Sequence, residues 1–147
     1  MSISKVSGET IIATFGGGYA LQGSLSTTDF DPTSNTNYYG GDALTSTAST
    51  TAQSRRVYIP KTGTIKFCYG FFSQTAQAFN AVGDLHINVN NGTYTLIQQQ
   101  SHLTTATLYS NTSLSIAVTQ GQYIEFRWRC PFYPPTKVLC EFVVYIE

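Results

Sequence analysis

Charged side chains are scarce in this chain, and neither sign is in excess. Asp, Glu, Lys and Arg make up 11% of the 147 residues, with 8 basic residues against 8 acidic ones. Binding to nucleic acid or to an anionic membrane surface depends on an excess of Lys and Arg, so we expect neither partner. A neutral chain is also poorly protected by charge repulsion against association. The composition therefore favours a protein that docks against copies of itself or against other proteins.

Long apolar runs are absent as well. The first residues, Met1–Gly8, lack the apolar core of a secretory signal, and no stretch approaches the roughly 20 apolar residues of a membrane-spanning helix. We therefore expect a protein that is made and folded in a cytoplasm and does not enter a membrane.

Cysteine is rare, and the spacing of the cysteines does not indicate a metal site. Cys68, Cys130 and Cys140 form an odd set without the pairs typical of zinc sites. Cys68 and Cys140 lie in strand-like patterns, where a free thiol behaves as a small apolar side chain. We predict buried, reduced thiols, and a disulfide between Cys130 and Cys140 across a hairpin is the alternative.

Groups suited to acid–base catalysis are also few. A hydrolase needs a nucleophile, a base and an orienting group, and the bases available are His86 and His102. Neither lies near a Gly-x-Ser-x-Gly motif or a carboxylate cluster. We interpret both as surface or interface histidines; a histidine repeated around a trimer axis, binding metal or sensing pH, is the alternative. The sequence predicts no enzyme.

The acidic residues near the N-terminus do not form a recognisable cation loop. Asp29, Asp31 and Asp42 lie in a loop-rich region, and the Asp-x-Asp pair lacks the further ligands and the turn glycine of a calcium loop. An Asx-turn that ends at Pro32 is the preferred interpretation. The glycine-rich stretch 15–19 lacks the lysine of a phosphate-binding loop. We expect no cofactor and no metal.

What the chain does contain is alternation of apolar and polar residues. Aromatic residues reach 14%, and a helical period of useful length is missing, which favours β-strands. In the stretch 64–72, alternation places Ile65, Phe67, Tyr69 and Phe71 on one face and Lys66, Cys68, Gly70 and Phe72 on the other.

The stretch 85–97 predicts a β-hairpin. Asn91-Gly92 lies between alternating segments, and this dipeptide favours the two-residue turn whose central residues both need positive φ. The resulting register pairs Val89 with Tyr94 and Ile87 with Leu96 on one face.

The last third of the chain predicts three further strands. Leu114–Val118 and Ile124–Trp128 flank a turn at Thr119–Gly121, and Val138–Ile146 follows a proline-aromatic loop. We expect the final strand to pair inside a sheet.

One of these strands presents charges on a single face. Glu125, Arg127 and Arg129 alternate with apolar residues. They are candidates for cross-strand salt bridges with Glu141 or for an interface ladder in which Arg is favoured; the sequence leaves both open.

The chain divides into two parts that differ in composition and in the density of strand patterns. Residues 1–54 are loop-rich, with first strands and the low-complexity stretch 45–54, and are expected to form an extended N-terminal arm that contacts neighbours. Residues 55–147 carry the dense strand signals. Many short strands separated by turns predict an all-β, antiparallel sandwich.

Short motifs in the second part resemble known β-domains. Pro60, Gly63 and Phe67, the turn at Gly121–Ile124 and the closing apolar strand resemble the globular heads of C1q and tumour-necrosis-factor-like proteins. The last 30 residues resemble virion and fibre-head proteins of bacteriophages and other viruses, through Gly121, Tyr123, Ile124, Glu125, Trp128, Pro131, Tyr145, Ile146 and Glu147.

The resemblance implies a jelly roll, usually trimeric, that decorates a particle or binds a receptor. The leading hypothesis is a virion structural protein, a homotrimeric subunit on a capsid or tail that contacts other virion proteins through its N-terminal arm. The alternative is a receptor- or glycan-binding head of a viral fibre, in which exposed Tyr38, Tyr39, Phe132 and Tyr133 would contact the ligand.

Overall fold

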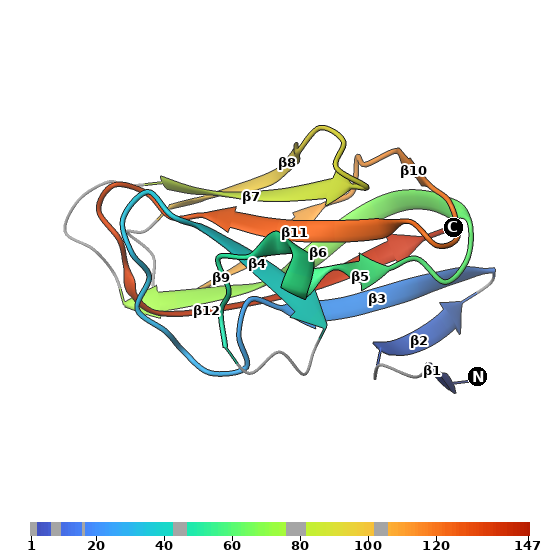
Figure 1. The fold of residues 1–147 in the computed structure, drawn as a ribbon, viewed down its shortest axis with the longest axis horizontal. Coiled ribbons are helices and arrows are strands. Elements are labelled where there is room, and N and C mark those ends of the chain that lie inside the picture. Colours follow the sequence, from blue (N-terminus) through green and yellow to red (C-terminus); the bar gives the residue numbers. More distant parts are fainter. Residues whose placement is uncertain (1–2, 7–9, 16, 43–46, 76–81, 102–105) are drawn as a thin grey trace.

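Strands dominate the part of the chain that the structure describes (Figure 1). The computed structural model describes residues 3–6, 10–15, 17–42, 47–75, 82–101 and 106–147. These residues form one short 3-10 helix, η1 (Ala52–Arg55), and twelve strands: β1 (Ile3–Val6), β2 (Thr10–Phe15), β3 (Gly18–Ser24), β4 (Asn37–Asp42), β5 (Val57–Tyr58), β6 (Gly63–Thr75), β7 (Val82–Val89), β8 (Thr95–Ser101), β9 (Ala106–Asn111), β10 (Ile116–Val118), β11 (Tyr123–Arg129) and β12 (Thr136–Ile146). The predicted all-β class is confirmed. Within the described part, no helix has the length and apolar character needed to cross a bilayer.

The strands join into one curled antiparallel sheet. Its main path runs β10-β6-β12-β3-β4-β11-β7-β8, and β9 adds to β6, β5 to β11 and β2 to β3. The closing strand β12 lies between β6 and β3. The prediction that the final strand pairs inside a sheet is therefore confirmed.

The curled sheet has two limbs that face each other. One contains β3, β12, β6 and β9, the other contains β11, β7 and β8, and the core lies between them. Every second residue of β12 is buried from Val138 to Ile146, as a strand with one face in the core requires. Phe142 of β12 stacks on Phe126 of β11, with ring centroids 4.0 Å apart. Phe72 of β6 lies 5.4 Å from the Trp128 ring. Aromatic contacts therefore connect the β6–β12 limb to the β11 limb.

The inner face of β6 differs from the strict alternation that the sequence predicts. Ile65, Cys68 and Phe72 are all buried, whereas Tyr69 is 46% exposed. A shift in the pairing of β12 with β6, between Tyr145 and Ile146, changes the register by one residue. Such an irregularity turns the following side chains to the other face. Ile65 consequently joins the core.

The hairpin of β7 and β8 is confirmed, but its turn lies one residue earlier than predicted. Asn90 and Asn91 take the positive φ angles, 52° and 62°, and the Gly92 N–H donates to the Val89 carbonyl. Asparagine tolerates this conformation through its short polar side chain. Ile87 therefore pairs with Thr95 rather than Leu96.

The change of turn alters which residues of β8 are buried. Leu96 is 44% exposed and Ile97 is buried. A register shift between Leu85 and His86 absorbs the extra residue. The prediction that Leu96 shares the face of Ile87 was thus wrong.

Part of the segment 1–54 belongs to this sheet. β3 lies between β12 and β4, and β4 pairs with β11. The low-complexity stretch, expected to be an extended arm or a loop, contacts the sheet where it is described: η1 covers Ala52–Arg55, and the Tyr39 N–H donates to the Ser49 carbonyl. Residues 45 and 46 lie outside the described residues.

The three cysteines are free and buried, as predicted, so the alternative of a Cys130–Cys140 disulfide was wrong. Burial raises the pKa of the Cys68 and Cys130 thiols to about 12 and raises that of Cys140 further. They remain neutral and act as small core side chains.

Candidate functional site

The outer surface of the β3–β12–β6–β9 limb carries a run of large apolar side chains. We call it the aromatic face and define it by Phe67, Tyr69, Phe71, Leu108, Val143 and Tyr145. Strand pairing places Tyr145 opposite Phe67, Val143 opposite Tyr69 and Phe71 opposite Leu108. Directly opposed residues of antiparallel strands leave the sheet on the same side. The six side chains therefore lie on one surface, across three strands.

The aromatic face is both ordered by ring contacts and open to solvent. Phe67 stacks on Tyr145 with centroids 4.7 Å apart and lies 5.9 Å from Tyr69. Leu108 is 83% exposed. A hollow of about 360 Å³ is lined by Ala20, Phe67, Tyr69, Val143 and Tyr145. This surface can receive an apolar group.

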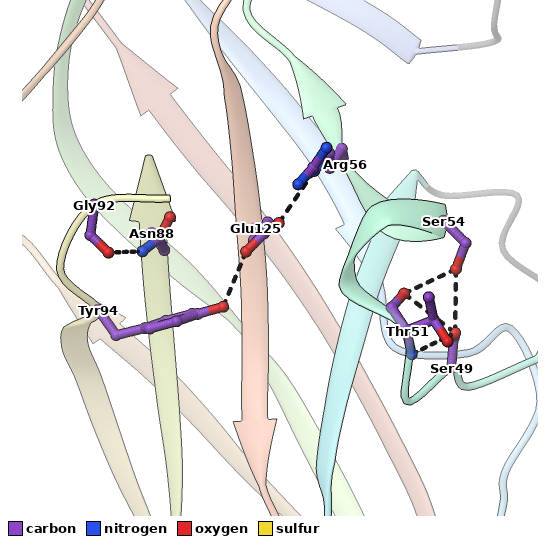
Figure 2. Close-up of polar contacts among 8 residues, drawn as sticks. All are labelled: Ser49, Thr51, Ser54, Arg56, Asn88, Gly92, Tyr94 and Glu125. Atoms are coloured by element: carbon purple, nitrogen blue, oxygen red, sulfur yellow. Dashed lines mark hydrogen bonds and ion pairs between the residues drawn. The ribbon is translucent and has the colours of Figure 1, made fainter. Parts of the chain in front are cut away.

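A polar network lies on the opposite limb, on the outer face of β11. Glu125 is only 4% exposed. The Arg56 Nε–H donates to its Oε1 at 3.2 Å, and the Tyr94 hydroxyl donates to its Oε2 at 2.9 Å (Figure 2). Asn88, which faces Glu125 from β7, donates to the Gly92 carbonyl in the hairpin loop. The buried carboxylate thus ties together the segment before β5, strand β11 and the loop before β8.

Arg127 and His86 extend this network along the sheet. The Arg127 guanidinium lies over the Tyr94 ring, 3.7 Å from its centroid, and Tyr94 meets the His86 ring edge-on at 6.2 Å. Burial and the Arg127 charge lower the pKa of His86. Burial and the bond to Glu125 raise the pKa of Tyr94, which keeps its hydroxyl a donor. Hydrogen bonds and ring contacts thus fix the positions of Tyr94, Arg127 and His86 along the outer face of the sheet.

The predicted charged residues divide between the two limbs. Glu125, Arg127 and Arg129 share one face of β11, with Asn88, His86 and Asp84 opposite them on β7. Glu141 lies on β12, whose partners are β3 and β6. A cross-strand salt bridge between Glu141 and these arginines was therefore a wrong expectation. The ion pair that the structure contains within its described residues joins Glu125 to Arg56.

The four predicted recognition residues are not brought together. Tyr38 is 8% exposed, its ring packs against Phe30 and Trp128, and its hydroxyl accepts the Thr33 N–H. Its predicted exposure was wrong. Tyr39 is half-buried and faces Arg127 on the polar side of the sheet.

Phe132 and Tyr133 form a separate exposed pair. They are 64% and 46% exposed, and their rings meet edge-on at 4.9 Å. The Ser34 hydroxyl donates to the Phe132 carbonyl, and the Asn35 N–H donates to the Pro131 carbonyl. Two loops at the same end of the molecule (Figure 1) therefore hold the aromatic pair in place.

The remaining polar candidates do not form a cation site where the structure describes them. The Asp31 carboxylate accepts a hydrogen bond from the Lys137 backbone N–H at 2.9 Å, and Lys137 has a φ of 51°. Among the described residues, no group of three His, Cys, Asp or Glu side chains could hold a metal ion. His102 lies outside the described residues.

Sequence reasoning missed two of the residues that organise these surfaces. Arg56 reaches Glu125 across 69 positions, and no local pattern connects them. Leu108 was overlooked within a Thr-rich stretch, although its alternation with Tyr109 in β9 was readable.

No family model, curated protein or solved structure matches this chain.

Proposed function

We propose that this protein is a virion structural protein: a C1q/TNF-like jelly-roll subunit that forms a homotrimer and decorates or stabilises a capsid or tail. The observation that carries the proposal is the aromatic face, a broad apolar surface on the outside of a small β-domain. The sequence resemblance alone supplies the viral context, and the curled antiparallel sheet supports the all-β part of the proposal.

The aromatic face has the composition of a protein interface. Soluble monomers rarely expose large contiguous apolar patches, and the cores of interfaces are enriched in Tyr and Phe. Tyr69 and Leu108 project from neighbouring strands with 46% and 83% of their surfaces exposed. Packing against further copies would remove this surface from water and stabilise the assembly by about 25 cal/mol per Å² of apolar surface buried.

Attachment to other virion proteins is assigned to the N-terminal segment. Among the described residues β1 pairs with no strand other than β2, and β2 extends the sheet from β3. A strand at the edge of a sheet can pair with a strand of another protein. This gives the segment a physical route to a capsid or tail protein.

Light scattering of the purified chain at micromolar concentration tests the assembly. We expect a trimer, and Tyr69→Lys should give a monomer because it buries a charge in the interface. Tyr58→Lys is the matched control, since Tyr58 is 63% exposed on β5, away from the aromatic face. A monomeric wild-type chain would contradict the proposal, as would its absence from purified particles of the virus that encodes it.

The second candidate function is recognition of a host glycan or receptor. The Phe132–Tyr133 pair favours it, because exposed aromatic rings on an anchored, proline-flanked loop can stack on a sugar ring with little loss of loop entropy. Binding on a glycan array that disappears in Phe132→Ala, with trimerisation unchanged, would support this function. Silence of the wild-type protein across arrays and receptor-bearing host cells would count against it.

A further inference from the structure

A small pocket opens beside the aromatic face, on the same outer surface. Its lining consists of Gln22, Gly23, Ser24, Thr27 and Glu141, and its volume is about 170 Å³. β12 holds Glu141 directly opposite Ser24 of β3, next to the pair formed by Val143 and Gln22. The pocket therefore continues the aromatic face toward Glu141.

Hydroxyl, amide and carboxylate side chains contribute to the lining of the pocket, and one of the hydroxyl groups is buried without a partner. Ser24 is 4% exposed, and its Oγ has no hydrogen-bond partner among the described residues. Buried hydroxyls in folded proteins are nearly always paired. An unpaired Oγ beside a pocket thus points to a ligand that hydrogen-bonds to this hydroxyl, which can accept as well as donate.

The only charge in the lining is negative. Glu141 supplies a carboxylate, whereas the other side chains are hydroxyls and an amide. Glu141 also stands outside the ion pair found in the described part of the chain, which joins Arg56 to Glu125. An ammonium or guanidinium group fits this lining, because it carries a positive charge and offers several donors and no acceptor.

Basic side chains suited to this role remain on the surface of the chain itself. Three of the eight basic residues are engaged internally: Arg55 donates to the Thr47 carbonyl, Arg56 pairs with Glu125, and Arg127 stacks on Tyr94. The exposed basic residues in the described part are Lys61, Lys66, Arg129 and Lys137.

We propose that the pocket receives a Lys or Arg side chain of a second copy of this chain, which pairs with Glu141 and donates to Ser24. The inference rests on the proposed self-association through the aromatic face. An apolar surface supplies affinity but little orientation, whereas a charge pair beside it fixes the alignment of the two copies.

Sedimentation measurements on the full chain test the pocket. Glu141→Gln keeps the shape and removes the charge, so it should raise the dissociation constant at least about 10-fold, as for a charge pair buried at an interface. Glu147→Gln is the matched control, because it makes the same charge change on an exposed residue outside the pocket. Ser24→Ala should weaken association less, and the effect of salt should be smaller in Glu141→Gln than in the wild type.

A charge reversal identifies the partner side chain. Glu141→Lys should abolish association, and one reversal to Glu at position 5, 61, 66, 129 or 137 should restore it. Failure of all five to restore it overturns the inference, as does a Glu141→Gln protein that associates like the wild type or like Glu147→Gln. In each of those cases the wild type still self-associates, so the proposed function survives; a wild type that does not associate overturns both.

Discussion

At the scale of single residues, close packing restricts one position where β9 pairs with β6. Gly70 is opposite Tyr109, whose hydroxyl donates to the Glu141 carbonyl at 2.9 Å. A Cβ at Gly70 would lie 2.6 Å from the Tyr109 hydroxyl oxygen and would collide with the Glu141 carbonyl oxygen. The missing side chain is what allows the tyrosine ring to cover the strand.

We therefore expect Gly70→Ala to lower the free energy of unfolding by about 1–3 kcal/mol, the usual range for overpacking. Urea denaturation followed by fluorescence measures it. Ser110→Ala, at an exposed position of the same strand β9, should change stability by no more than about 0.5 kcal/mol. Equal stability of the two variants would show that the Tyr109 ring can move aside.

His86 predicts a dependence of stability on pH. Its pKa is lowered by burial and by the Arg127 charge, with Asp84 acting in the opposite direction. The unfolded chain, with an ordinary histidine pKa of about 6.5, therefore binds the proton more readily than the folded chain. The stability contribution is present above that pH and is lost as the pH falls through the lowered pKa of the folded state.

Denaturation of the wild type and of His86→Gln at several pH values between about 7.5 and 5 tests this. The wild type should lose more stability than the variant as the pH falls, because only the wild type gains a charge beside Arg127. Identical pH dependence of the two proteins would contradict the assignment.

At the scale of elements, the Glu125 network joins strands that are distant in sequence. Arg56 precedes β5, Glu125 lies in the middle of β11, and Tyr94 lies before β8. Arg56 also covers the Tyr123 ring, 4.0 Å from its centroid. The Glu125 side chain is 5% exposed and that of Arg56 is 22% exposed, so the carboxylate depends on partners from the protein.

Arg56→Ala should therefore destabilise the fold by about 1–3 kcal/mol, because it leaves a buried carboxylate with Tyr94 as its remaining side-chain partner. Adding Glu125→Gln to this variant should recover part of the loss, since the uncompensated charge is then removed. Chemical denaturation of the two single variants and the double variant gives the coupling. The control Lys66→Ala, at an exposed lysine, should have little effect, and additive losses would mean that the pair is not coupled.

At the scale of the whole molecule, stability depends on aromatic contacts between the two limbs of the curled sheet. Phe142 is 1% exposed and stacks on Phe126. Phe142→Ala should lower the free energy of unfolding by about 3–5 kcal/mol, through lost burial and the cavity that remains. Phe132→Ala is the matched control, since its 64% exposed ring should contribute less than about 0.5 kcal/mol. Comparable losses in thermal or urea denaturation would contradict the placement of the core.

Local order was readable from the sequence because strands and turns depend on neighbouring residues. Alternation located the final strands, the charged face of β11 and the turn at Gly121, which has φ of 85° and a bond from the Gln122 N–H to the Thr119 carbonyl. The composition was enough to predict an all-β protein with buried thiols.

Only the tertiary structure decided which face of each strand is inside and which distant residues meet. Alternation on β6 is compatible with either face in the core, and the shift at Tyr145–Ile146 reverses it locally. Burial of Tyr38, the position of Phe67 and Tyr69 beside Tyr145 on the outer face, and the Arg56–Glu125 pair all depend on strand order in the curled sheet. The physical reason is that side-chain alternation is a property of one strand. Which face of that strand is buried, and which residues pair with its charges, is set by the strands packed around it.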